Sequence, residues 1–273
     1  MRLIFLTLGL IVVSFCYSQP VKYSNEFMSI GTGARQLAMG SVSSSTVKDI
    51  YSVYWNPAGL SESLNDIELG AMHSEYFAGI ANYDFLAVAK RLADSSYISL
   101  SMFRFGVDDI PNTLELVDKQ GNIWYDRIKS FSVADYAFLV SFSNPVSPKG
   151  INYGGSLKVI RRVIGDFASA WGIGLDFGLT YRFGDWRLGI MGRDISSTYN
   201  LWKFNNEEFE YAFTLTGNEI PINTSEVTLP KFIPSLSRSF TFKENFTLIA
   251  EAGANITSDG KRNVLLKGDP FSI

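Results

Sequence analysis

The chain has 273 residues, of which 46% are hydrophobic and only 19% are charged, with a formal net charge of −3, which is enough material for one large domain. The negative balance, with no cluster of lysine and arginine, argues against nucleic acid as a partner. The single cysteine, Cys16, excludes a disulfide framework.

The first 18 residues are typical of a signal peptide that is removed on export. A basic residue, Arg2, precedes an apolar stretch over residues 3–13, and Ser18 offers a plausible cleavage site. Lipidation at Cys16 is the alternative, although the bulky residue before it is unfavourable for that modification. No later run of about 18 apolar residues could form a membrane helix.

Residues 19–66 precede the first predicted strand and contain the segments IGTGAR, AMG and YWNPAGL. Their glycines permit positive φ angles or close backbone approach, and the Asn-Pro pair favours a turn. Arg35 is the one strong cation among them, and a charge inside a barrel must be paired, so Asp176 and Glu251 are its expected partners. We interpret the segment as plug packing, with direct ligand contact as the alternative. The selected residues are Gly31, Gly33, Arg35, Met39, Gly40, Trp55, Asn56, Pro57 and Gly59.

The stretch Trp171–Gly184 alternates strictly between large apolar residues and small or polar ones. Such alternation is typical of a β-strand with two unlike faces, and this strand is longer than the about 5–6 residues usual in soluble proteins. Its aromatic ends favour a strand that crosses an outer membrane with its apolar side towards lipid. The predicted lipid-facing residues are Trp171, Ile173, Leu175, Phe177, Leu179, Tyr181 and Phe183.

Similar patterns predict nine strands, at residues 67–74, 80–91, 95–105, 131–142, 153–164, 171–183, 186–194, 228–242 and 246–256. The connections 93–95, 144–150, 184–185 and 243–245 are short, whereas 106–130 and 195–226 are long. Outer-membrane barrels have short periplasmic turns and longer extracellular loops. We therefore expect the long loops outside and residues 19–66 in the periplasm or the barrel interior, with a soluble secreted β-sandwich or propeller as the alternative.

The long loops carry apolar and aromatic residues that are typical of a protein-binding surface. These residues are Ile110, Trp124, Tyr125, Trp202 and Phe204.

Charged residues on the polar side of the strands are expected to face the barrel interior. These residues are Lys158, Arg162, Asp176, Arg182, Arg187, Arg193 and Glu251. Mixed charge of this kind most often cross-links a barrel and holds a plug, and a polar conduit is the alternative. His73, the only histidine, is too isolated for a metal site, and no nucleophile motif accompanies it. The sequence therefore predicts no enzyme, no metal site and no cofactor.

The segments IGTGAR, AMG and YWNPAGL together resemble the N-terminal hatch of the PorV/PorQ family, relatives of the FadL fatty-acid transporters. The stretch GLDFGLTYRFGDWRLGIMGRDISSTYN resembles the middle of the same family. The resemblance implies an all-β transmembrane barrel, FadL-like and fourteen-stranded, with a partly helical hatch, in the outer membrane of a Bacteroidetes-type bacterium. It also implies association with the type IX secretion system, whose best-known member of this family receives cargo through C-terminal signal domains.

On this basis the chain divides into a signal peptide at 1–18, a hatch at 19–66 and a barrel at 67–273. The expected partners are outer-membrane lipid and secretion-system subunits or cargo signal domains. The alternative function is a FadL-like channel for hydrophobic small molecules. Nine strands are fewer than the family has, the number is odd where single-chain bacterial barrels have even numbers, and the ending NVLLKGDPFSI lacks a closing aromatic strand. We therefore expect the sequence to be truncated.

Overall fold

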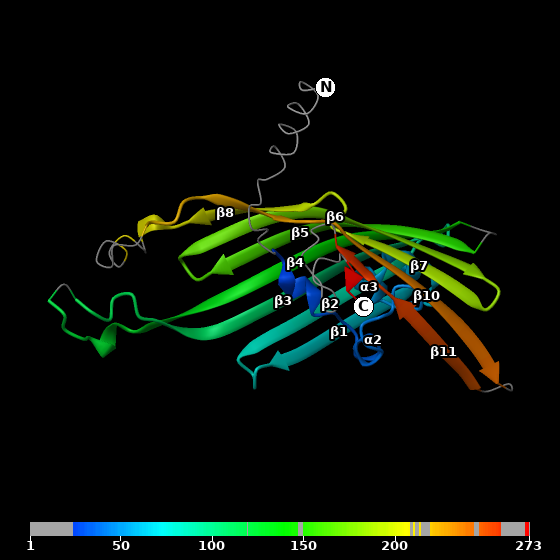
Figure 1. Cartoon of the computed structure of the whole chain (residues 1–273), viewed down its shortest axis with the longest axis horizontal. Coiled ribbons are helices and arrows are strands. Elements are labelled where there is room, and N and C mark those ends of the chain that lie inside the picture. Colours follow the sequence, from blue (N-terminus) through cyan, green and yellow to red (C-terminus); the bar gives the residue numbers. More distant parts are fainter. Residues whose placement is uncertain are drawn as a thin grey trace, which may run out of the picture.

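The computed structural model describes residues 24–118, 120–146, 150–207, 210, 213, 219–242, 246–257 and 271–272. The predicted signal peptide and the turn at 243–245 lie outside these residues. In the described part, an antiparallel sheet carries a layer of short helices against one face (Figure 1). No helix there is both long enough and apolar enough to cross a membrane.

Residues 24–66 form the helical layer, which we call the hatch. Its elements are η1 (Glu26–Ser29), α2 (Ala34–Ala38), α3 (Ser52–Trp55) and η2 (Pro57–Glu62). Positive φ angles at Gly31 and Gly33 separate η1 from α2. Asn56 begins η2, because its side chain accepts a hydrogen bond of 3.1 Å from the Ala58 N–H and Pro57 fits the first helical position.

Thirteen strands form one sheet within the described residues. They are β1 (Ile67–Tyr76), β2 (Ala81–Arg91), β3 (Tyr97–Asn112), β4 (Lys129–Val146), β5 (Ile151–Ile164), β6 (Ala168–Phe183), β7 (Trp186–Arg193), β8 (Thr198–Phe204), β9 (Thr224–Thr228), β10 (Lys231–Phe242), β11 (Phe246–Gly253), β12 (Asn255–Thr257) and β13 (Phe271–Ser272). Strands β1 to β7 pair in chain order and β10 follows β7. The all-β prediction is confirmed, and each of the nine predicted strands overlaps an observed one, although the last, at 246–256, is divided into β11 and β12. The sheet is open in this part of the chain, since β1 pairs only with β2.

The prediction of one long loop over 195–226 is wrong, because it contains β8 and β9. Strands β7 and β8 follow one another along the same edge of β6, separated by a turn in which Asp194 and Ser197 have positive φ angles. Likewise, β9 pairs with β8 and β10 pairs with β7, with only residues 229–230 between them. Two long strands are thus interrupted at the same level of the sheet.

Short connections occur at both ends of the strands. Residues 77–80 join β1 to β2 and residues 165–167 join β5 to β6, at the end opposite the tight turn 184–185. The predicted segregation of short turns to one end is therefore wrong in part. The connection between β3 and β4 remains long, and in Figure 1 it projects from the end of the sheet at which β8 ends.

The predicted outward side of β6 is confirmed. Six of its seven selected residues are exposed and Leu179 is half-buried. The residues that alternate with them are buried, namely Gly172, Gly174, Asp176, Gly178 and Thr180. The register extends this pattern across the sheet, on the face that we call the outer face. One exposed apolar row consists of Leu69, Val88, Leu100, Val140, Leu157 and Leu175, which are successive register partners on six strands.

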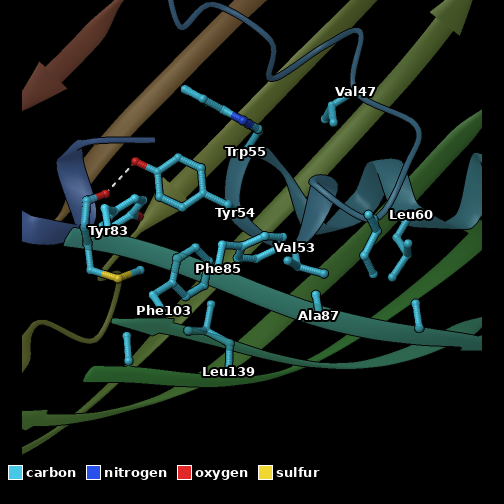
Figure 2. Packing of buried hydrophobic residues seen from close by; sticks show 14 of the residues in the cluster. Val47, Val53, Tyr54, Trp55, Leu60, Tyr83, Phe85, Ala87, Phe103 and Leu139 are labelled. Carbon is cyan, nitrogen blue, oxygen red and sulfur yellow. Dashed lines mark hydrogen bonds between the residues drawn. The ribbon is translucent and has the colours of Figure 1, made fainter. Parts of the chain in front are cut away.

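The hydrophobic core lies between the hatch and strands β2 to β4. Figure 2 shows Val53 and Tyr54 of the hatch facing Phe85 and Phe103 of the sheet, with Leu139 beside them. The Phe85 and Phe103 ring centroids are 4.8 Å apart. The face that the hatch covers, which we call the inner face, therefore carries an aromatic and aliphatic patch on these strands, beside the buried serines Ser99, Ser101, Ser141 and Ser143.

Candidate functional site

The hatch rests on glycines of the inner face. A Cβ atom at Gly154 would lie 2.6 Å from the carbonyl carbon of Pro57, and one at Gly189 would lie 2.4 Å from the carbonyl oxygen of Ser44. Both distances are too short for any side chain. The alternation of small residues along β5 and β7 thus provides the surface on which the hatch backbone sits.

Asn56 anchors the hatch to β6. Its side-chain amide donates to the Ser44 carbonyl at 2.7 Å and to the Leu179 carbonyl at 3.2 Å. A Cβ atom at Gly178 would lie only 2.0 Å from the Asn56 Oδ1 atom. The Asn-Pro motif identified in the sequence therefore both caps η2 and binds the hatch to the sheet.

The other selected hatch residues divide between a buried centre and an exposed rim. The Trp55 indole donates to the Thr32 carbonyl at 2.7 Å, and a Cβ atom at Gly59 would meet the Val47 carbonyl oxygen at 2.3 Å. Pro57 is buried as well. At the rim, Gly40 is exposed and Met39 is half-buried. These placements agree with plug packing.

The predicted pairing of Arg35 is wrong. Its side chain is exposed in α2. Asp176 accepts instead from the Lys158 ammonium at 3.0 Å, and Glu251 accepts from the backbone N–H of Ser45 at 2.9 Å and from its hydroxyl at 2.7 Å. Because Arg35 stays in solvent, it needs no buried partner.

A buried ion cluster joins β5, β6 and the turn after β7. The Lys158 ammonium lies 3.0 Å from Asp176 and 2.6 Å from Asp194, and its side chain is 1% exposed. Asp176 also accepts from the Asp194 backbone N–H at 2.8 Å. The sequence placed Lys158 and Asp176 on one face but missed Asp194, which follows a strand and lies in an irregular turn.

A second ion cluster lies where β8 and β9 join the sheet. Arg162 donates to Asp135 through two nitrogens, at 2.8 and 3.1 Å, and to Glu226 at 3.3 Å. Its guanidinium also lies 5.0 Å from the centre of the Trp202 ring. Trp202 is only 8% exposed. The prediction that Trp202 belongs to a partner-binding loop is therefore wrong.

The remaining predicted partner residues differ in exposure. Ile110 lies in β3 and Phe204 in β8, and both are half-buried. Trp124 and Tyr125 are exposed in the connection between β3 and β4. Asp118 orders this tip, since it accepts from the Trp124 indole at 3.0 Å.

Two arginines of β7 connect the sheet to the hatch. Arg193 donates to the Tyr54 backbone carbonyl at 3.0 Å, and its guanidinium lies 4.3 Å from the Tyr54 ring centre. Arg187 forms an ion pair with Glu62 of η2. The seventh selected charge, Arg182, is exposed and its side chain makes no ion pair within the described residues.

His73 lies on the outer face and binds Asp84 through its Nδ1 atom at 2.7 Å. No group of three histidine, cysteine or acidic side chains with metal-binding geometry occurs in the described ranges. The site therefore consists of packing, hydrogen bonds and ion pairs between the hatch and the inner face.

A scan against protein-family models finds no match. A search of curated proteins also finds none. Among solved structures, one similar chain is described as "TodX deltaS2S3 mutant monoaromatic hydrocarbon channel". Its TM-score is 0.48 at 14% sequence identity, and the match covers 85% of this chain and 71% of that chain. The finer assignment to the PorV/PorQ family has no support among these comparisons and stays a prediction.

Proposed function

We propose that the chain is an outer-membrane barrel subunit that admits hydrophobic small molecules past its hatch. The exposed apolar rows of the outer face support membrane insertion, because neighbouring strands present aliphatic side chains at the same level, as a lipid-facing band requires. A soluble sheet rarely exposes such a continuous apolar surface.

The observation that carries the proposed ligand class is the aromatic and aliphatic patch on the inner face of β2 to β4. Tyr83, Phe85 and Phe103 are fully buried there under the hatch, together with Leu139 of β4. Porins that pass water and ions have polar interiors. Displacing the hatch would uncover an aromatic and aliphatic lining, which favours a hydrophobic ligand.

A cross-link between hatch and sheet tests whether the hatch gates this path. The Ser61 backbone N–H donates to the Ser143 hydroxyl at 3.1 Å, so the double variant Ser61→Cys/Ser143→Cys brings two thiols close to disulfide range. The matched control is Ser141→Cys/Ser156→Cys, since these buried hydroxyls lie 2.8 Å apart on neighbouring strands and leave the hatch free. Both are made in a Cys16→Ser background.

Uptake of labelled toluene and oleate is measured in cells that express the whole chain. The oxidised hatch cross-link should block uptake, and reduction should restore it, while the control pair transports in both states. Equal uptake by the oxidised and reduced hatch variant would contradict gating by the hatch.

Membrane orientation is tested with an impermeant maleimide on whole cells. A cysteine at Asn205, beside the long segment, should react, whereas one at Asp185 in the tight turn should react only after lysis. Labelling of position 185 alone would reverse the orientation and contradict the placement of the long loops outside.

A role in protein secretion is the second candidate, favoured by one observation. Tyr125 is 73% exposed beside Trp124, on a tip that Asp118 holds in place, and exposed aromatic residues on an ordered loop suit protein contact. A pull-down from native outer membranes tests this role. Loss of co-purified secretion components in Trp124→Ala/Tyr125→Ala would support a role in secretion, and a chain that purifies without such components would contradict it.

A further inference from the structure

Two arginine–tryptophan pairs lie on the outer face, one near each end of β6. The Arg161 guanidinium lies 4.9 Å from the centre of the Trp171 ring, and these residues are direct register partners on β5 and β6. The Arg238 guanidinium lies 5.1 Å from the centre of the Trp186 ring, and these residues are register partners on β10 and β7. Both arginines therefore lie against an aromatic ring, on the side of the sheet that the hatch does not cover.

The two pairs bound the apolar band of the outer face. Phe183, at the end of β6, is the register partner of Trp186, and the outward residues between Trp171 and Phe183 are all aliphatic or aromatic. Trp171 and Phe183 are 12 positions apart, which corresponds to about 40 Å along a strand. A strand tilted by about 35–45° then crosses about 28–32 Å of a bilayer. The hydrocarbon core is about 30 Å thick, so the two guanidinium groups would lie at the level where the lipid phosphates begin.

Arg161 has no acidic partner among the described residues. Apart from the indole ring, it contacts one backbone carbonyl, to which it donates at 3.5 Å. Its register partner on β4 is Tyr136, which carries no charge at neutral pH. The aspartate of the same register row, Asp84, pairs with Arg104 at 3.4 Å. Because a guanidinium has five N–H donors, Arg161 keeps both its charge and most of its donors for a ligand.

Arg238 also forms no ion pair within the described part of the chain. Its guanidinium lies between two rings, 5.1 Å from the centre of Trp186 and 4.9 Å from that of Phe240. The buried Nε atom has no hydrogen-bond partner among the described residues. Asp185 of the adjacent turn contacts this strand through its backbone carbonyl, which accepts from the Ser239 N–H at 3.0 Å. A donor without a partner is unfavourable, so an acceptor bound beside the guanidinium would stabilise it.

We propose that Arg161 and Arg238 bind the phosphate groups of membrane lipids, Arg161 in the leaflet on the long-loop side and Arg238 in the leaflet on the tight-turn side. A guanidinium offers paired donors to a phosphate while its plane stays stacked on an aromatic ring. Tryptophan favours the membrane interface. The apolar rows beside both arginines suit acyl chains, which a free phosphate lacks. The inference rests on the membrane insertion proposed above but not on the transport of hydrophobic molecules.

Protection of the two arginines from p-hydroxyphenylglyoxal, which modifies arginine, tests the proposal. The whole chain is purified in dodecyl maltoside and treated in mixed micelles that contain either phosphatidylglycerol or the phosphate-free lipid digalactosyl diacylglycerol. Peptide mass spectrometry measures the modification rates. Phosphatidylglycerol should slow modification of Arg161 and Arg238 several-fold relative to the galactolipid. The matched control is Arg127, whose guanidinium lies 4.9 Å from the Trp124 ring centre in the connection between β3 and β4, and its rate should be equal in both lipids.

Equal rates in the two lipids at either arginine would overturn the proposal, and equal protection by inorganic phosphate would overturn its assignment to lipid. The variant Arg161→Gln/Arg238→Gln should retain several-fold less phosphatidylglycerol after a dodecyl maltoside wash, whereas Arg127→Gln should retain as much as the unaltered chain. Unchanged retention in the double variant would also contradict the sites.

Flotation with digalactosyl diacylglycerol vesicles separates this inference from the proposed function. A chain that floats with these vesicles but shows no phosphate-dependent protection contradicts the lipid-phosphate sites alone. A chain that does not float contradicts membrane insertion and, with it, the proposed function.

Discussion

Replacing Gly154 by alanine should push the hatch away from β5. The new Cβ atom would lie 2.6 Å from the Pro57 carbonyl carbon and 2.7 Å from the Ala58 nitrogen. Carbon contacts normally lie at about 3.5–4.0 Å, so the overlap is about 1 Å. Both contacted atoms belong to backbone and cannot rotate aside. Overpacking of this kind costs about 1–3 kcal/mol, and the free energy of unfolding should fall by that amount.

Gly155 provides the matched control on the same strand. A side chain at this position would point to the outer face. Its Cβ atom would meet only the Asp176 carbonyl oxygen at 3.4 Å, which is an ordinary contact. Gly155→Ala should change the free energy of unfolding by less than about 0.5 kcal/mol. Urea unfolding measures stability, and tryptic cleavage after Lys48 measures release of the hatch. If Gly154→Ala matches Gly155→Ala in both assays, the hatch does not sit on β5 as described.

Three further changes probe other parts of the fold. Leu175→Arg on the outer face should destabilise the chain in lipid by about 2–4 kcal/mol. Thr180→Ser on the inner face keeps its hydroxyl and should have little effect. Equal tolerance of both variants would show that β6 does not lie in lipid. Lys158→Met leaves two buried carboxylates unpaired and should cost about 3–5 kcal/mol in urea unfolding, and a neutral result would mean that the cluster is hydrated. Hydrogen bonds from the Trp124 indole and then from Asn122 lower the pKa of Asp118. Its folded pKa is therefore below the unfolded value, so the carboxylate stabilises the loop tip above about pH 4 and this is lost on acidification. The protection of the tip amides, meaning their exchange rate relative to the intrinsic rate at the same pH, should decrease on acidification, and Asp118→Asn should remove that dependence. An unchanged protection profile would contradict the role of Asp118.

The alternation of large apolar residues with small or polar ones predicted most strands, because the two faces of a strand such as β6 have different surroundings. Leu175 and Phe177 lie on the outer face, while Gly174 and Asp176 meet other strands and ion pairs. Gly174 leaves no room for a side chain, since a Cβ atom there would lie 1.9 Å from the Thr198 hydroxyl oxygen. A single strand pattern reveals its two faces but not what covers them.

Strand β8 was missed because its pattern is less distinct. Tyr199 and Leu201 face outward, yet Trp202 and Phe204 on the inner side are equally large. The alternation of size that identified β6 is absent, and the turn before β8 uses non-glycine residues at positive φ. Sequence reasoning reads such a segment as an apolar loop.

The ion pairs of the site could likewise be predicted only in part from the sequence. The charges on β5 to β7 could be assigned to the inner face by parity, but their partners depend on tertiary position. Asp194 reaches Lys158 only because the turn after β7 folds back over β6. Glu62 reaches Arg187 only because the hatch docks with η2 against the strands. No spacing in the sequence encodes either contact.

The hatch is held differently on its two sides, which bears on how it could move. Towards β7 and β11 its contacts are directional, through Arg187, Arg193 and Glu251, and breaking a buried charged contact costs about 3–5 kcal/mol. Towards β2 and β3 most of its contacts are aromatic and aliphatic, with hydrogen bonds from the Tyr97 hydroxyl to the Ser63 and Asn65 carbonyls at one end. The apolar contacts are non-directional, so they tolerate sliding. Any displacement should therefore begin over β2 to β4, the side that would uncover the apolar lining. The disulfide between positions 61 and 143 restrains the hatch on that side, so it should block transport more fully than a cross-link on the β7 side.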